Sequence, residues 1–174
     1  MKNIIKVLLL VSGGLTFNAN GADGSFDFEL KLVHDTCNLT AGSKNMQVQL
    51  GNISRAELAS IGATSKPVDF TIRATDCAPG LAVYFRFDGE TSQNWEAFAL
   101  DVESVAEGVG VQLNDNDVED DLYIKAPYST SGYGVYVKAD GTFSKPFQAR
   151  YIALTDKVTP GTANVTTQLN LVYN

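Results

Sequence analysis

The sequence predicts an all-β protein, and within that class an immunoglobulin-like sandwich. Apolar and polar residues alternate with a period of two along most of the chain, and turn-forming residues separate these runs at short intervals. Two cysteines lie about 40 residues apart, as in many sandwiches of this kind. The 174 residues, 44 % of them hydrophobic, suffice for one domain with its own core. The pattern alone does not separate this sandwich from a jelly roll.

Residues 1–21 have the composition of a signal peptide. Two lysines precede a short apolar stretch, and small residues follow at Ala19 and Gly21, where a signal peptidase reads them. We expect cleavage after Gly21, with cleavage after Ala19 or Ala22 as alternatives. The apolar stretch is too short to span a bilayer, so the segment predicts export rather than a membrane anchor.

The only two cysteines, Cys37 and Cys77, are predicted to form a disulfide. An exported chain reaches an oxidising compartment, where two cysteines in a small domain usually pair. Closing a loop of about 40 residues stabilises the fold by roughly 4 kcal/mol in the chain-entropy model.

Ten runs of alternating residues are expected to form strands, and one short segment is expected to be helical. Ser54 and Glu57 have the spacing of a capping box, and Gly62 follows at a place where a helix can end. The strands are expected at residues 25–32, 46–50, 68–73, 83–87, 97–102, 109–113, 122–125, 135–138, 147–154 and 164–174.

The first and last strands do not fit a closed sandwich. Phe26, Phe28, Leu30 and Leu32 alternate with polar residues almost at the start of the exported chain. The last run carries Val165, Thr167, Leu169, Leu171 and Tyr173 on one face and continues to the final residue, so no further strand follows it. An apolar strand at a sheet edge needs a cover. One solution is intermolecular, with the first strand of one copy completing the sheet of the next.

At this point the chain resembles a chaperone–usher fimbrial subunit of the type 1 pilin kind. The resemblance runs from about Gly24 to Asn174, and Gly161 stands fourteenth from the C-terminus, where the β-zipper motif of the family has its glycine. The other matching segments are residues 32–37 (LVHDTC), 48–51 (VQLG), 58–77, 108–113 (GVGVQL), 146–151 (PFQARY) and the penultimate Tyr173.

The resemblance implies an incomplete immunoglobulin-like sandwich that lacks its seventh strand and is completed by a donor strand from another subunit. It divides the chain into a signal peptide (1–21), a donor-strand extension (22–33) and a pilin domain (34–174). The implied donor residues are Phe26, Phe28, Leu30 and Leu32, although the family usually has Gly where this chain has Leu30. The implied acceptor groove and chaperone-binding residues are Gly161, Val165, Thr167, Leu169, Leu171, Tyr173 and Asn174.

The same resemblance implies three kinds of partner: a periplasmic chaperone, an outer-membrane usher and neighbouring pilin subunits. It places the protein in a fimbrium on the bacterial surface, reached through the periplasm, where it supports adhesion. The place of the subunit along the fibre stays open between the major shaft and a minor or tip-proximal position.

Composition argues against several other classes of function. A net charge of −7 disfavours nucleic acids and anionic membranes as partners. A single histidine, His34, and two cysteines do not supply a zinc site or a catalytic constellation, so we expect neither an enzyme nor a cofactor. The acidic run 114–121 lacks the spacing of an EF-hand and is better explained as a solvated turn.

Two alternatives to a structural subunit remain at this stage. One is a single-domain polymeric adhesin that binds a host glycan or protein directly. The other is a monomeric secreted domain whose N-terminal strand folds back into its own groove.

Overall fold

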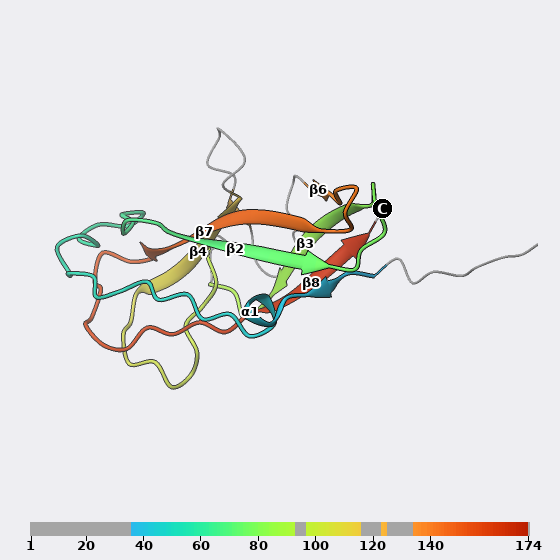
Figure 1. The fold of residues 1–174 in the computed structure, drawn as a ribbon. Coiled ribbons are helices and arrows are strands. Elements are labelled where there is room, and N and C mark those ends of the chain that lie inside the picture. Colours follow the sequence, from blue (N-terminus) through green and yellow to red (C-terminus); the bar gives the residue numbers. More distant parts are fainter. Residues whose placement is uncertain (1–35, 93–96, 116–122, 125–133, 174) are drawn as a thin grey trace, which may run out of the picture. The chain divides into compact units, whose positions relative to one another are not determined.

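The computed structural model describes residues 36–92, 97–115, 123–124 and 134–173 and shows two antiparallel sheets with one short helix (Figure 1). The larger sheet has the strand order β1-β2-β7-β4-β5, and the smaller has the order β6-β3-β8. The elements are β1 (Asn38–Leu39), α1 (Ala41–Lys44), β2 (Val68–Thr75), β3 (Ala82–Asp88), β4 (Val109–Asp115), β5 (Tyr123–Ile124), β6 (Val135–Tyr136), β7 (Phe143–Ala153) and β8 (Gln168–Tyr173).

The larger sheet is centred on β7, which pairs with β2 on one side and β4 on the other. Phe70 lies opposite Phe147 in the first ladder, and Leu113 lies opposite Ala149 in the second. Buried and more exposed residues alternate along β7 from Phe143 to Arg150, as expected for a strand with one face on the core. The ladders therefore follow the period-two pattern of the sequence.

Phe147 joins the two sheets. Its side chain is fully buried, and its ring centroid lies 5.6 Å from that of Phe70, 5.2 Å from that of Phe85 and 5.4 Å from that of Phe87. The contacts with Phe85 and Phe87 are edge-to-face, a geometry that adds to the stabilisation from burial. Since Phe85 and Phe87 belong to β3, this aromatic cluster holds the smaller sheet on the larger one.

A buried ion pair joins the ends of two neighbouring strands. Nζ of Lys145 on β7 lies 2.6 Å from Oδ1 of Asp115 on β4, and both side chains are almost completely buried. Removing one partner of such a pair is costly because the other charge stays buried.

The disulfide between Cys37 and Cys77 is confirmed, with a Cα–Cα distance of 4.4 Å. The backbone N–H of Cys37 also donates a hydrogen bond of 3.0 Å to the hydroxyl of Tyr173. Cys37, near the start of the described chain, is thereby fixed both to the loop between β2 and β3 and to the end of β8.

Most of the predicted strands are present, but three expectations for local structure are wrong. Residues 46–50 form no ladder, and of the run 97–102 only Phe98 makes isolated bridges, to Thr91 and Val111. The segment after Ser54 forms turns instead of a helix, although Glu57 does accept the expected hydrogen bond from the Ser54 N–H at 3.2 Å. The short helix α1, the one helix in the described ranges, was not predicted.

The predicted signal peptide and the predicted strand at residues 25–32 lie outside the described residues. Among the described residues, no helix is long and apolar enough to cross a membrane.

Candidate functional site

The last strand, β8, lies at the edge of its sheet. It pairs with β3 from Val83 opposite Tyr173 to Asp88 opposite Gln168, and no other strand of the described residues lies on its other side. Val165, Leu169, Leu171 and Tyr173 pack against the main core while staying only partly buried. The inner face of this edge strand therefore covers the core incompletely.

The chain just before β8 is extended. Its backbone bonds to residues 101–106 lie along one edge, and on the opposite edge the carbonyl of Ala163 accepts a hydrogen bond from the Tyr151 hydroxyl. The N–H of Asp101 donates to the carbonyl of Asn164 at 2.8 Å, and the carboxylate of Asp101 accepts from the N–H of Thr166 at 2.9 Å. In an extended chain successive residues direct their backbone polar groups to opposite edges. The N–H and C=O groups of Val165 therefore point away from Asp101, toward the edge where β8 lacks a neighbour.

A second extended segment lies across from this edge. Along residues 46–50, Met46, Val48 and Leu50 are partly buried whereas Gln47 and Gln49 are exposed, which is the burial pattern of a strand. No strand partner is assigned to this segment within the described part of the chain.

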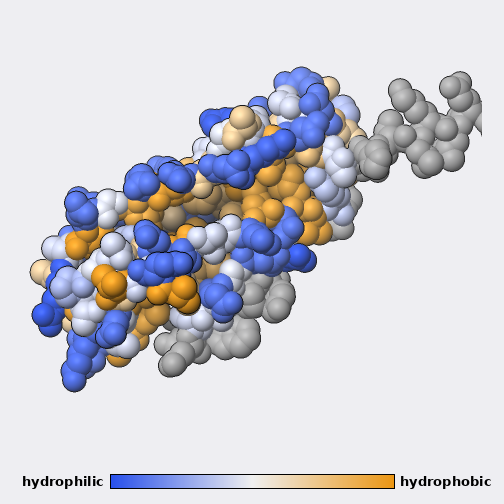
Figure 2. All heavy atoms as spheres, turned by 90° about the horizontal axis from the view of Figure 1, so that it is seen from below, coloured by the Kyte–Doolittle hydropathy of each residue, from blue (hydrophilic) through white to orange (hydrophobic). Residues whose placement is uncertain are grey.

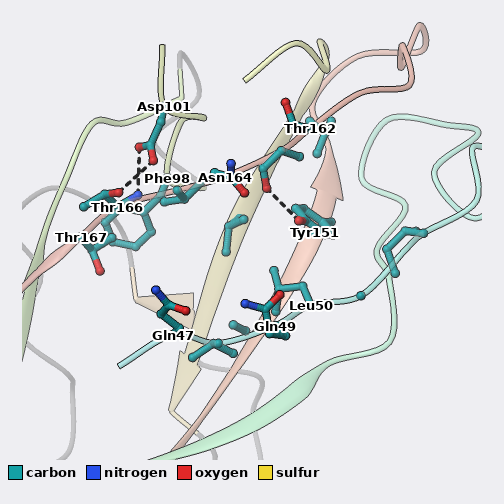
Figure 3. A pocket seen from close by; sticks show the side chains of 18 of the residues that line it. Gln47, Gln49, Leu50, Phe98, Asp101, Tyr151, Thr162, Asn164, Thr166 and Thr167 are labelled. Carbon is teal, nitrogen blue, oxygen red and sulfur yellow. Dashed lines mark hydrogen bonds between the residues drawn. The ribbon is translucent and has the colours of Figure 1, made fainter. Parts of the chain in front are cut away.

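Figure 3 shows the two segments facing each other. Gln47 lies across from Thr167, and Leu50 lies on the side of Tyr151. Residues 46–50 therefore run in the direction opposite to residues 162–169.

Between the two segments lies a groove of about 1290 Å³ with an apolar floor. Its floor comes from the core faces of both sheets, and Figure 2 shows the apolar atoms along its length between rims of polar atoms. Small-molecule sites usually measure roughly 300–1,000 Å³ and are concave pockets. A long groove whose two sides are extended segments with no strand between them among the described residues instead fits an added strand. The floor residues are Phe70, Ile72, Phe87, Phe98, Val111, Leu113 and Ala149.

Tyr151 extends from β7 into the groove and supports the wall formed by residues 162–169. Its hydroxyl donates a hydrogen bond of 2.8 Å to the carbonyl of Ala163, and its backbone N–H donates to Oγ of Ser65 at 3.0 Å. Burial raises the pKa of the Tyr151 phenol above its ordinary value. The side chain thus stays neutral and remains a donor at physiological pH.

One end of the groove depends on a glycine. A Cβ atom on Gly161 would lie 2.6 Å from the backbone nitrogen of Ala106 and 2.6 Å from Cγ2 of Val105. The close approach allows the N–H groups of Val105 and Ala106 both to donate to the carbonyl of Thr162, each at 3.1 Å. Because residue 161 is a glycine, the chain can pack tightly against residues 105–106 at the point where the groove wall begins.

The structure brings together most of the acceptor residues expected from the sequence. Gly161, Val165, Thr167 and Leu169 line the groove, and Leu171 and Tyr173 continue the same inward row. Asn174 and the expected donor residues Phe26, Phe28, Leu30 and Leu32 lie outside the described residues.

The sequence did not identify the floor residues of the groove or its other wall, which includes Val48, Leu50 and Tyr151. The alternation at 46–50 was a usable signal for Val48 and Leu50, because an alternating segment without a strand partner among the described residues can form the side of a groove.

No group of three or more His, Cys, Asp or Glu side chains is placed to hold a metal ion in the described part of the chain.

Comparisons with known proteins point to one family. The family described as "Fimbrial protein" matches residues 25–174. The "Type-1 fimbrial protein, A chain" of Escherichia coli is 34 % identical over 156 residues, which cover 86 % of this chain and 82 % of that protein. The "Fimbrial-like protein FimF" of Salmonella typhimurium is 28 % identical over 177 residues, covering 98 % and 99 %.

Solved structures show the same fold. A type I fimbria protein of Burkholderia pseudomallei is similar with a TM-score of 0.58 and 28 % identity, over 79 % of this chain and 88 % of that one. The P pilus rod subunit PapA is similar with a TM-score of 0.64 and 21 % identity, over 79 % and 99 %, which supports the fold alone.

Proposed function

This chain belongs to the fimbrial protein family, and from that premise we propose that it is a structural subunit of a surface fimbria that polymerises by donor-strand exchange. In this proposal residues 22–33 of one subunit fill the groove of the next. Residues 1–21 are a signal peptide that directs export to the periplasm, and residues 34–174 are the pilin domain.

One observation carries the proposal: a groove with an apolar floor lies between two extended segments, and no strand of the described part of the chain lies between their facing edges. Residues 46–50 form one rim and residues 162–169 the other, with core side chains as the floor. The leading part of the same chain carries an alternating apolar segment, Phe26–Leu32, that would bury its large side chains in such a groove. The apolar floor of the groove and the apolar side chains at every second residue of the segment are therefore complementary.

The expected stabilisation is large enough for a durable polymer. Each fully buried side chain among Phe26, Phe28, Leu30 and Leu32 contributes roughly 1.5–3 kcal/mol. Each added main-chain hydrogen bond contributes about 1 kcal/mol, and ordering the segment offsets part of the gain. Because the whole ladder must break at once, dissociation is expected to be slow.

An open groove also explains why other proteins belong to the assembly route. An apolar edge that is exposed before polymerisation invites aggregation. A periplasmic chaperone that supplies a temporary strand covers it, and an outer-membrane usher then provides the place where the strand of the next subunit replaces it. The basic residues of that chaperone bind the carboxylate of Asn174, and Leu171 and Tyr173 lie beside the inserted strand.

The proposal is tested with Phe28→Asp and, as a matched control on the opposite face of the same segment, Glu29→Gln. We expect Phe28→Asp and deletion of residues 22–32 to keep the subunit out of fibres, measured by electron microscopy and by the loss of SDS-resistant multimers in unboiled samples. Glu29→Gln should assemble like the unchanged chain. Normal incorporation of the deletion variant would refute the donor role.

A further inference from the structure

Three of the four exposed large apolar side chains of the described residues lie close to one small apolar cluster, and the fourth lies by itself. Ile61, Val102, Val105 and Tyr136 are 66 %, 95 %, 65 % and 73 % exposed. Single exposed apolar residues are ordinary, but a gathering of them marks a contact surface. The three lie in turns and mark one place, and the fourth, Tyr136, lies close to the disulfide and marks a second.

The first place is here called the turn end and consists of Ile61, Val102, Val105 and Gly161. Ile61, Val102 and Val105 are each within two residues of Ala63, Leu100 or Ala106, which pack on the cluster of Leu58, Val109, Ala153 and Val158. Val105 lies against Gly161, where the groove begins.

The second place is here called the disulfide end and consists of Cys37, Cys77, Tyr136 and Tyr173. Tyr136 pairs with Ala82, the neighbouring residue Val83 pairs with Tyr173, and the hydroxyl of Tyr173 accepts from the N–H of Cys37.

These two ends lie at opposite ends of β7. The N–H of Cys77 donates to the carbonyl of Gly141, just before β7 begins at Phe143, and Ala153 at its other end belongs to the cluster of the turn end. Eleven residues of strand extend about 33 Å. In Figure 1 the turns lie at the left and the C-terminal end of β8 at the right.

The length of the connecting chain forces two joined subunits into contact. Only residues 33–36 lie between Leu32, the last donor side chain, and Cys37 at the disulfide end of the donor subunit. These five steps reach at most roughly 18 Å. The donor strand leaves the acceptor groove at one of the two ends of the groove. The disulfide end of the donor subunit must therefore lie against that same end.

Charge indicates that the strand leaves at the turn end. The groove has Lys44 on the rim toward Gln47 and Asp101 beside Thr166 on the opposite rim. The donor segment carries Asp27 and Glu29 in its first half and Lys31 in its second. With Leu32 toward Gly161, Lys31 lies near Asp101 and Asp27 toward Lys44, whereas the reverse orientation brings like charges together.

The position of the acceptor's own N-terminal extension points to the same orientation. The extension of the acceptor leaves from Cys37 at the disulfide end. A donor strand that left the groove at the disulfide end would meet this extension. Head-to-tail growth instead needs the donor strand and the acceptor's own extension to leave the acceptor at opposite ends.

We propose that the turn end of one subunit and the disulfide end of the next form a second subunit–subunit contact, in which Tyr136 of one copy covers Val102 and Val105 of its neighbour. The partner is another copy of this chain, and the inference rests on the proposed donor-strand exchange. Tyr is favoured at such contacts because its ring buries a large area at low entropic cost and its hydroxyl stays hydrated.

A disulfide trap tests the contact. The pair Val102→Cys with Tyr136→Cys is compared with the two single variants and with a control pair, Asp69→Cys with Tyr136→Cys. Asp69 suits the control because it is exposed and pairs with Gln148 in the middle of β7, away from both ends. Oxidised fibres are boiled in SDS without reductant, which disrupts donor-strand pairing but keeps new disulfides. We expect at least tenfold more dimers and larger species from the Val102 pair than from the controls, and their loss on reduction.

Fibres of the Val102 pair that form normally but give no more covalent dimer than the controls would overturn this contact and leave the proposed function intact. Absence of fibres from the unchanged chain would instead overturn the proposed function. As an independent measurement, Val102→Glu should shorten fibres several-fold, and Tyr136→Lys added to it should restore most of their length. Wild-type length in Val102→Glu also contradicts the contact.

Discussion

Gly161→Ala is expected to damage the groove although it adds only one methyl group. The new Cβ would lie 2.6 Å from the Ala106 nitrogen, well inside ordinary van der Waals contact. The side chain of Val105 can rotate away, but the backbone of Ala106 cannot, because its N–H is bonded to the carbonyl of Thr162. Residues 160–162 must therefore move away from residues 105–106.

The magnitude follows from these contacts. Overpacking a tight site typically costs about 1–3 kcal/mol. Weakening the two hydrogen bonds to the Thr162 carbonyl adds about 1 kcal/mol. The free energy of unfolding should thus fall by about 2–4 kcal/mol, a large share of the roughly 5–15 kcal/mol of an ordinary domain.

The measurement is urea unfolding of the purified subunit with a saturating peptide of residues 22–33 in its groove. Gly42→Ala is the matched control, because a Cβ at Gly42 meets nothing within 4 Å. We expect Gly42→Ala to leave the midpoint unchanged or to raise it slightly, since Ala is the better helix former. Affinity for the peptide should fall in Gly161→Ala and stay unchanged in Gly42→Ala.

A loss below about 0.5 kcal/mol in Gly161→Ala, with unchanged peptide affinity, would show that residues 160–162 yield freely. The groove wall would then not be held by the packing at Gly161.

Three further results are expected. Replacing both Cys37 and Cys77 by Ser should lower the free energy of unfolding by about 4 kcal/mol, measured by urea titration, and an unchanged midpoint would contradict the loop-closure argument. Because burial raises the pKa of Tyr151, the stability tied to its neutral phenol is complete below pH of about 10 and is lost as the pH rises through the raised pKa. Tyr151→Phe should therefore flatten the alkaline decline in melting temperature, and an equally steep decline would assign it to other groups. Lys145→Met should cost about 3–5 kcal/mol in calorimetry because the Asp115 charge stays buried, and Asp115→Leu added to it should recover most of the loss; additive losses would contradict this reasoning.

The sequence predicted the paired strands well because their alternation reflects one buried face. The runs 68–73, 83–87 and 109–113 became β2, β3 and β4, and the run 147–154 became the second half of β7. The start of β7 was missed because Lys145 and Pro146 interrupt the apolar pattern. Lys145 is nevertheless buried by its pairing with Asp115, which a single-sequence pattern does not reveal.

The misses around the groove have one physical cause. Residues 46–50 alternate like a strand and are buried like a strand, yet no ladder forms. Residues 164–167 are likewise extended ahead of β8. In both cases the periodicity predicted side-chain burial correctly, whereas a ladder also requires a neighbouring strand that these segments do not have within the described chain.

The short helix and the failed helix show the limit of local signals. Ala41–Lys44 has no amphipathic period, and it is held by the hydrogen bond from the Arg73 N–H to Oγ of Ser43. Ser54 and Glu57 interact as a capping pair should, but Gly62 follows too soon for a helix to grow.

The hydrogen bond between Tyr173 and Cys37 bears on how a fibre would carry load. In a polymer built as proposed, tension on a subunit arrives through the foreign strand beside β8 and departs through its own extension at Cys37. At the disulfide end, the Tyr173 hydroxyl joins the end of β8 to Cys37, and the disulfide to Cys77 ties Cys37 to the core. Much of the tensile load would then pass along the edge of the domain formed by β8, and little of it would pass through the aromatic cluster around Phe147.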